Sequence, residues 1–317
     1  MITKKILILI FICIGFIAKS QTPSEDPNHY VLDTYDDFTL FNSNLWNAVP
    51  NNTWGLETYS ANNVTASNGV LELKCEKVGN DYISGGIETV NKKAFSYGYF
   101  EIESKLPLSG IRGPWGGFWM HTGEGGWDEI DVLEPNGCDC ELGTQFHSGV
   151  FATHGGTTRS YARIYDGFPN LSFNYNKYAL IWTPKYVQVL VNDEILYEIV
   201  DPLYVPSHPM FVFLTFQIDP YGCAPNTSTF PTKYWRYKNF KYYRLKTDCS
   251  NGIIQNNFNF SNHDYKVQKY YSLSNSTIPN NSNIVLRATD YIELNGIFTV
   301  PLGSTFTAIT HCNTCPN

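Results

Sequence analysis

The stretch "WDEIDVLEPNG", residues 127–137, alternates apolar and acidic side chains in the middle of the chain. Alternate residues of a β-strand share a face, so Glu129 and Asp131 point one way while the apolar residues between them point into a core. Strict alternation would then bury Glu134 with the apolar set, which is costly for a charge. A one-residue β-bulge after Asp131 returns Glu134 to the acidic face. The spacing of two and then three residues therefore predicts a bulged strand.

The acidic face of this strand has a spacing that suits sugar chemistry. With the bulge, the Cα atoms of Glu129 and Glu134 lie roughly 13 Å apart. Two glutamate side chains of about 4 Å each can lean together and leave their carboxyl groups about 5 Å apart. That separation is typical of a retaining glycosidase, in which one carboxylate attacks the sugar and the other protonates the leaving oxygen. Asp131 between them would hydrogen-bond Glu129 and favour a protonated neighbour by like-charge coupling.

Two other interpretations of the acidic strand stay open on the residues alone. The three acids could form a solvated surface, although like charges crowded on one strand repel each other. They could also bind Ca²⁺, which takes oxygen ligands, usually from a flexible loop. The pattern by itself suggests catalysis without excluding either alternative.

From residue 30 to residue 245 the chain is a series of short apolar runs with period-two alternation, and almost no stretch keeps a helical period. Four such runs are "GVLELKCEKV" (69–78), "YGYFEIESKL" (97–106), "YVQVLVNDEILYEIV" (186–200) and "PMFVFLTFQI" (209–218). Asn192-Asp193 separates two runs and predicts a hairpin. About 215 residues of this kind fit one large all-β domain.

The first twenty residues have the pattern of a secretory signal peptide. Two lysines precede an apolar run of twelve residues, 6–17, and a small-residue site follows at 18–20. The run is well short of the roughly 20 residues that a membrane-spanning helix needs. We expect cleavage before Gln21, a mature protein that is secreted or at the cell surface without a membrane anchor, and a short linker over residues 21–29.

Cleavage there removes three lysines and moves the formal net charge from −7 to −10. So acidic a chain repels phosphate backbones and anionic membrane surfaces, and nucleic acid is not an expected partner. In an oxidising compartment most cysteines should pair, although the mature chain holds an odd number: Cys75, Cys138, Cys140, Cys223, Cys249, Cys312 and Cys315. Cys138 and Cys140 follow the acidic strand and could tie its loop to Cys223. The final Cys-x-x-Cys lacks a second pair, which favours a disulfide or structural role over zinc or redox chemistry.

The amino-acid composition of the chain changes near residue 247, where Asn and Ser become frequent. The later stretch "IVLRATDYIELNGIFTVPLGSTFTAI" (284–309) alternates again and is punctuated by Gly296 and Gly303. We therefore expect the sandwich domain to span residues 30–246 and a small accessory β-rich module to span residues 247–317. A module of about 70 residues is near the size at which a core alone is marginal.

The surroundings of the acidic strand resemble glycoside hydrolase family 16, of the laminarinase and agarase kind. "WDEIDVLE" (127–134) has the bulged Glu-x-Asp-x-x-Glu form of that family's active-site signature. Four further stretches resemble family segments in the expected order: "NVTASNGVLELK" (63–74), "SGGIETVNKKAFSYGYFEIESKLP" (84–107), "GPWGGFWM" (113–120) and "YALIWTPKYVQVLVND" (178–193). The C-terminal module resembles small β-rich repeats of secreted Bacteroidetes proteins, most closely over residues 286–306, a likeness that implies no activity.

The family resemblance implies a concanavalin A-like β-jelly-roll sandwich whose concave face carries a cleft for β-linked polysaccharides, cleaved at internal bonds with retention of configuration. It implies Glu129 as the nucleophile, Asp131 as the assisting acid and Glu134 as the general acid/base. His147, in "TQFHSG" (144–149), matches a family position close to the acid/base and is a candidate substrate-binding residue. A lone histidine is more often a satisfied structural residue, and that alternative stays open. The resemblance implies no required cofactor. Some relatives bind a structural Ca²⁺ away from the cleft, and the sequence does not place its ligands.

Sugar clefts need flat apolar faces against which pyranose rings can stack. The candidates are Trp54, Trp115, Trp119 and Trp127. Trp115 and Trp119 match cleft positions of the family, whereas any of the four could equally lie in the core, where most tryptophans of a sandwich are found.

The substrate is the least determined feature, because the family spans β-1,3-glucans, mixed-linkage glucans, agar, porphyran and carrageenan. A sulfated polymer would favour Arg or Lys in the cleft, and this acidic chain offers few candidates, such as Arg112, Arg159 and Arg163. We expect a monomeric endo-hydrolase of a neutral, laminarin-like β-1,3-glucan. The alternatives are an endo-galactanase, a transglycosylase with the same covalent intermediate, and a lectin, which would have no need of both Glu129 and Glu134.

Overall fold

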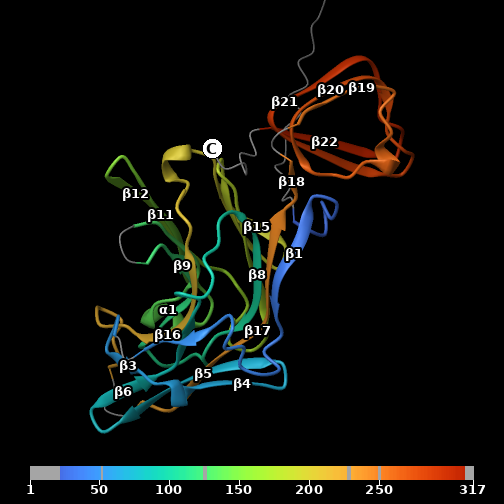
Figure 1. The fold of residues 1–317 in the computed structure, drawn as a ribbon. Helices are drawn as coiled ribbons and strands as arrows, with labels where there is room; N and C mark the ends of the chain where they lie inside the picture. Colours follow the sequence, from blue (N-terminus) through green and yellow to red (C-terminus); the bar gives the residue numbers. More distant parts are fainter. Residues whose placement is uncertain (1–21, 51–52, 124–126, 227–229, 249–250, 311–317) are drawn as a thin grey trace, which may run out of the picture.

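The computed structural model describes residues 22–50, 53–123, 127–226, 230–248 and 251–310. The predicted signal peptide and three cysteines, Cys249, Cys312 and Cys315, lie outside the described residues. Across the described ranges almost every element is a β-strand, and the strands form three sheets (Figure 1). No helix within them is long and apolar enough to cross a membrane.

Two of the sheets make the sandwich. Among the described strands, ten form the first sheet, in the order β15-β14-β13-β8-β17-β5-β6-β3 with β1 beside β17 and β4 beside β5. Its strands are β1 (Tyr30–Asp36), β3 (Glu57–Tyr59), β4 (Val64–Ser67), β5 (Val70–Val78), β6 (Asp81–Ser84), β8 (Gly98–Lys105), β13 (Asn176–Trp182), β14 (Val187–Val191), β15 (Glu194–Ile199) and β17 (Lys233–Leu245). Asn192 and Asp193 join β14 to β15 with φ angles of 50° and 72°, so the predicted hairpin is confirmed.

The second sheet of the sandwich carries the acidic strand at its centre. Seven of the described strands form it, in the order β12-β11-β10-β9-β16-β7-β2. They are β2 (Asn47–Ala48), β7 (Gly86–Glu88), β9 (Pro114–His121), β10 (Glu129–Glu134), β11 (Phe146–His154), β12 (Thr157–Tyr165) and β16 (Phe211–Ile218).

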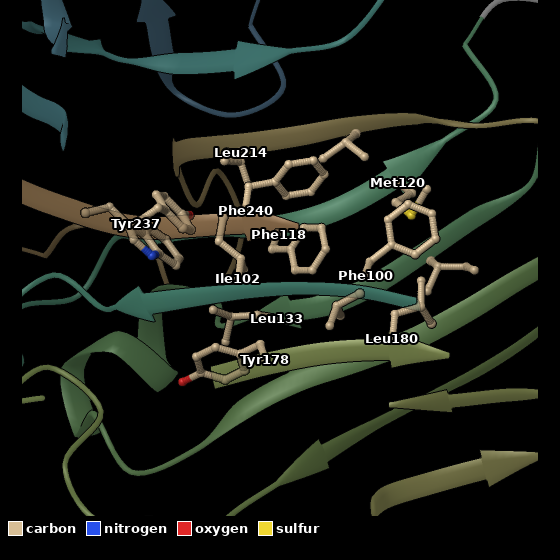
Figure 2. Packing of buried hydrophobic residues seen from close by; sticks show 14 of the residues in the cluster. Phe100, Ile102, Phe118, Met120, Leu133, Tyr178, Leu180, Leu214, Tyr237 and Phe240 are labelled. Carbon is tan, nitrogen blue, oxygen red and sulfur yellow. The ribbon is translucent and has the colours of Figure 1, made fainter. Parts of the chain in front are cut away.

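The core lies between these two sheets and follows from the period-two alternation of their strands. Figure 2 shows Phe100 and Ile102 of β8 close to Phe118 of β9 and Leu133 of β10, all without solvent exposure. Alternate residues of the second sheet therefore face away from the core, where a cleft can form. The prediction of an all-β sandwich is confirmed.

One α-helix, α1 (Gly137–Leu142), follows the acidic strand directly and was not predicted from the sequence. The side chain of Asn136 caps it by accepting hydrogen bonds from the backbone N–H groups of Cys138 and Asp139. The Asp139 carboxylate in turn accepts a hydrogen bond from the backbone N–H of Asn136. Gly143 ends the helix. Six residues are too few to show a helical period, so only these capping residues could have indicated it. The short 3₁₀ helices are Ala61–Asn63, Pro202–Tyr204 and Phe260–Asn262.

The third sheet lies beyond β17 and consists of parallel strands. They are β18 (Thr247–Asp248), β19 (Ile253–Asn256), β20 (Val267–Thr277), β21 (Asn283–Thr299) and β22 (Thr305–Thr310). Ile253 pairs with Tyr271, which pairs with Ile292, so successive turns of the chain stack as a coil at one end of the sandwich (Figure 1). The sequence predicts strands here, and the structure adds that they run parallel.

Residues 22–29, expected to form a linker, pack against this coil. Asp26 accepts a hydrogen bond from Nε of Arg287 at 2.6 Å and lies 2.7 Å from Nδ1 of His29. Arg287 and His29 have no exposed surface. The segment differs from an exposed linker because a buried ion pair joins it to the coil.

Candidate active site

The acidic strand is bulged at the predicted position. On β11, Asp131 pairs with Gly149 and Glu134 pairs with His147, so β10 has one more residue than its neighbour between these pairs. Two consecutive apolar residues, Val132 and Leu133, are consequently both buried. The carbonyl oxygen of Leu133 lies 1.9 Å from where a Cβ on Gly117 of β9 would be, so only glycine allows this approach. The predicted bulge is confirmed.

The bulge brings Glu129 and Glu134 to one hollow on the face of the second sheet turned away from the core. The hollow has a volume of about 530 Å³. It is lined by the acids Glu88, Glu129 and Glu134, by all four predicted tryptophans, Trp54, Trp115, Trp119 and Trp127, and by Val90, His121, Gly123, Phe213 and Gln217. The structure therefore brings the predicted aromatic residues to the same place as the two glutamates.

The three acids of β10 cannot all be ionised in this setting. Burial and the charges of Glu134 and Glu129 raise the pKa of Asp131 well above its ordinary value. Burial and the charge of Glu129 raise the pKa of Glu134 to about 7. Burial also raises the pKa of Glu129, but a hydrogen bond with Asp131 opposes the rise. The arrangement favours a protonated Asp131, an ionised Glu129 and a Glu134 that is protonated up to near-neutral pH.

An aromatic wall extends from Glu129 along the hollow. The ring of Trp119 stacks on Phe213 at a centroid distance of 4.4 Å, and its Nε1 donates to Oγ1 of Thr215 at 2.9 Å. Trp54 meets the edge of Trp119 at 5.2 Å. Trp127 is 58% exposed, which leaves its ring available to a ligand. Fixed rings of this kind suit the apolar faces of sugars.

Trp115 lines the hollow next to Glu134, and His147 lines a second hollow with both of them. Nε1 of Trp115 donates to Oε1 of Glu134 at 3.1 Å, a role beyond the predicted stacking surface. A second hollow of about 310 Å³ continues there and is lined by Trp115, Glu134, Asn136, His147, Asp219, Tyr221, Gly222 and Cys223. Glu134 therefore lines both hollows. This is the position expected of a group that protonates the bond between two sugars.

Three polar residues that line the larger hollow were missed in the sequence: Glu88, His121 and Gln217. His121 pairs with Glu129 across β9 and β10, and burial lowers its pKa, so it is neutral at neutral pH. Burial raises the pKa of Glu88. Because these residues come from three different strands, only the strand pairing reveals that they share a face.

The hollow beside Glu129 is acidic. No Lys or Arg of the described chain lines it, and Arg112, Arg159 and Arg163 lie elsewhere. Arg112 donates instead to the carbonyl oxygen of Gly222 and lines a separate hollow with Glu141. The described residues also contain no group of three or more His, Cys, Asp or Glu side chains placed to hold a metal ion.

One disulfide bounds this end of the site. Cys138 of α1 pairs with Cys223 in the loop after β16. The sequence had left open whether Cys138 or Cys140 is the partner of Cys223. Cys140 and Cys75 are buried free thiols. The disulfide fixes α1 against the loop that carries Asp219 and Tyr221.

Several known proteins are similar to this chain in sequence or in fold. Residues 51–219 match the family described as Glycosyl hydrolases family 16. A keratan-sulfate endo-1,4-beta-galactosidase from Sphingobacterium multivorum is 28% identical over 181 residues, which cover 52% of this chain and 41% of the relative. A beta-glucanase from Rhodothermus marinus is 28% identical over 219 residues, which cover 62% of this chain and 74% of the relative. This chain thus spans less than half of the length of the galactosidase.

The likeness in fold extends to the catalytic domain of an endo-1,3-beta-glucanase (laminarinase) from Thermotoga petrophila RKU-1. The TM-score is 0.58 at 23% identity, over 69% of this chain and 99% of that domain. At this identity the likeness concerns the fold alone, and it confirms the predicted jelly-roll sandwich. The matched family segment includes Glu129, Asp131 and Glu134 and makes up more than half of the chain. The predicted family is therefore confirmed: the chain belongs to family 16 of the glycosyl hydrolases.

Proposed function

We propose that the protein is a secreted, retaining endo-glycanase that hydrolyses a neutral, laminarin-like β-1,3-glucan. The observation that carries this proposal is the shared hollow of Glu129 and Glu134, two carboxyl groups of one bulged strand among four tryptophans. A hollow open at the surface and continued beyond Glu134 suits a polymer that is cut within its length.

The proposed reaction is a double displacement. The Glu129 carboxylate attacks the anomeric carbon while Glu134 gives its proton to the glycosidic oxygen, which breaks the bond and forms a glycosyl-enzyme ester. Glu134, now ionised, then takes a proton from water, whose oxygen attacks the same carbon and frees Glu129. Asp131 stays protonated and hydrogen-bonds Glu129, which orients the nucleophile. No cofactor takes part in these steps.

The charge of the cleft supports a neutral substrate. Glu88 and Glu129 line the hollow together with the tryptophans, and no Lys or Arg of the described chain does so. A sulfate ester there would face both acids without a cationic partner. Hydroxyl groups can instead donate to these carboxylates. The alternative is an endo-galactanase, which the similarity to a galactosidase named for keratan sulfate supports.

Secretion and an accessory role for the module over residues 247–317 belong to the same proposal. The Cys138–Cys223 disulfide supports export, because such bonds persist in oxidising compartments. A polysaccharide is the expected partner, and we propose that the protein acts on it as a monomer. A structural Ca²⁺ stays a prediction without assigned ligands.

Digestion of a panel of polymers tests the proposal. The chain without its first 20 residues would be incubated with laminarin, lichenan, agarose, porphyran, κ-carrageenan and keratan sulfate, and the products resolved by mass. We expect a ladder of short oligosaccharides from laminarin and none from the sulfated polymers. A Glu134→Gln preparation, purified identically, controls for contaminating enzymes.

Each other pattern of products would overturn a defined part of the proposal. Cleavage of a sulfated polymer would contradict the neutral substrate and favour the galactanase. In a parallel incubation with oligosaccharides of laminarin, products longer than those supplied would indicate a transglycosylase. Tight binding of a polymer without any product would favour the lectin and contradict catalysis altogether.

A further inference from the structure

A buried carboxylate beside the cleft has no part in the double displacement described above. Asp139, on α1, is 1% exposed. Its Oδ2 lies 2.7 Å from Nδ1 of His147 and accepts a hydrogen bond from the backbone N of Asn136 at 3.0 Å, while Oδ1 accepts one from Gln145. Burial alone would raise the pKa of Asp139, but these hydrogen bonds, with that of His147 the strongest, lower it below the ordinary value. Asp139 is therefore an ionised group whose cationic partner is His147.

The helix that carries Asp139 is fastened at its first turn. Cys138, the preceding residue, is joined to Cys223 by the disulfide. The backbone N of Gly137 donates to Oδ2 of Asp219 at 3.3 Å, and a Cβ on Gly137 would lie 2.1 Å from the carbonyl oxygen of Cys223. Only glycine fits there. The loop after β16 thus fixes the first turn of α1, which carries the Asp139 carboxylate.

The imidazole that Asp139 holds lies next to Glu134. His147 pairs with Glu134 across the bulge, and both side chains line the second hollow. The hydrogen bond with Asp139 raises the pKa of His147, while burial opposes the rise. His147 is consequently a cation over more of the neutral range than a free histidine. Burial and the charge of Glu129 raise the pKa of Glu134, while the Trp115 hydrogen bond and the charge of His147 lower it. The charge of Asp139 also raises this pKa, by less than His147 lowers it.

We propose that Asp139 is a positioning residue that acts through His147 on the proton of Glu134. The inference rests on the proposed role of Glu134 as the acid/base. Asp139 fixes the ring of His147 and keeps it cationic, so that Glu134 can release its proton to the leaving oxygen and take one back from water within each turnover. Among the described residues, the titratable groups that face Glu134 are Glu129 and Asp131 on its own strand, His147 on β11 and Asp139 on α1. Asp219 and Tyr221, in the loop after β16, line the second hollow with it.

A merely structural role for Asp139 makes a different prediction. Oδ2 also caps α1 through the backbone of Asn136, so a capping residue would affect stability alone. Loss of a cap costs about 1 kcal/mol of stability and leaves the pH profile of the reaction unchanged. Positioning through His147 must instead change the pH profile, and loss of Asp139 must raise the alkaline limb only while His147 is present.

The test compares kcat, KM and the pH dependence of kcat/KM for the wild type, Asp139→Asn, His147→Gln and the double variant, on the polymer that the wild type cleaves. We expect Asp139→Asn to lower kcat about tenfold with KM nearly unchanged, and to move the alkaline limb upward by about half a pH unit or more. The limb rises because His147 loses its charge near neutral pH and no longer offsets the charge of Glu129, an effect larger than the opposing one from the lost charge of Asp139, which itself raises the pKa of Glu134. The double variant should have the kcat of His147→Gln alone, with an alkaline limb that is no higher.

Glu141→Gln is the matched control, because it removes an acid of the same helix that lies 43% exposed beside Arg112, outside the cleft. Its profile should equal that of the wild type. A ¹⁵N NMR titration of the histidine rings gives a readout without substrate: His147 should be cationic at neutral pH in the wild type and lose this in Asp139→Asn. This titration also keeps the inference testable if Asp139→Asn does not fold.

An unchanged pH profile in Asp139→Asn, or a neutral His147 at pH 7 in the wild type, would overturn the inference while the proposed function stands. Additive effects in the double variant would also overturn it, because Asp139 would then act independently of His147. A wild type that cleaves no polymer would overturn the proposed function, and this inference with it.

Discussion

Glu129→Gln is expected to lower the turnover of the cleaved polymer on the order of 10⁴-fold or more, since the reaction loses its nucleophile. The substitution keeps the shape of the side chain and removes only its charge, so the substrate should still bind with nearly the same KM. The initial rate of reducing-end release measures the effect. Glu141→Gln, an equal loss of charge on the exposed face of α1, should keep the wild-type rate.

The same substitution should leave the thermal midpoint unchanged or raise it. The charge of Glu129 raises the pKa of both Asp131 and Glu134, so repulsion between carboxylates makes these two acids take up protons on folding near neutral pH, which costs stability. Removing the charge of Glu129 relieves this repulsion, as often happens where function and stability conflict. A Glu129→Gln protein within tenfold of the wild-type rate would place the nucleophile elsewhere, and a lower thermal midpoint would contradict the proposed repulsion.

Asp26→Asn is expected to cost about 3–5 kcal/mol in the unfolding transition that includes the C-terminal coil. Arg287 has no exposed surface and keeps its charge at every accessible pH. Burial lowers the pKa of His29, which leaves Arg287 as the lasting cationic partner of Asp26. Without the carboxylate, the guanidinium remains buried and loses this ion pair. Urea unfolding followed by tyrosine and tryptophan fluorescence measures the change.

Two further variants test whether loss of the buried ion pair causes the decrease in stability. Asp26→Asn combined with Arg287→Met should recover much of the loss, because no unpaired charge stays buried. Asp264→Asn breaks an exposed ion pair of the same coil, with Lys266 at 3.1 Å, and should change stability by less than about 0.5 kcal/mol. Equal costs for Asp26→Asn and Asp264→Asn would mean that the buried pair does not fasten residues 22–29 to the coil.

The sandwich and the acidic strand could be predicted because their signals are local. Alternation over a few residues determines which side chains enter the core, and the two-then-three spacing of the acids requires the bulge. The bulge is forced by the cost of burying Glu134 among Val132 and Leu133. Each of these inferences needs only neighbouring residues.

The parts that were missed depend on contacts between distant residues. Trp115 and Glu134 are 19 positions apart, and their hydrogen bond follows from strand pairing that alternation does not determine. Arg287 lies within an apolar run, and its partner Asp26 is 261 positions away. Asp139 is the intermediate case: Asn136, Asp139 and Gly143 have the spacing of a capped helix, a local signal that could have revealed α1.

The anomeric configuration of the first products tests the central claim most directly. In ¹H NMR spectra recorded from the first minutes of laminarin hydrolysis, a double displacement through Glu129 predicts that the β-anomer of the new reducing end appears first. The α-anomer should then grow only as fast as mutarotation allows. An α-anomer that appears first would show inversion, which needs no covalent intermediate, and would contradict Glu129 as the nucleophile.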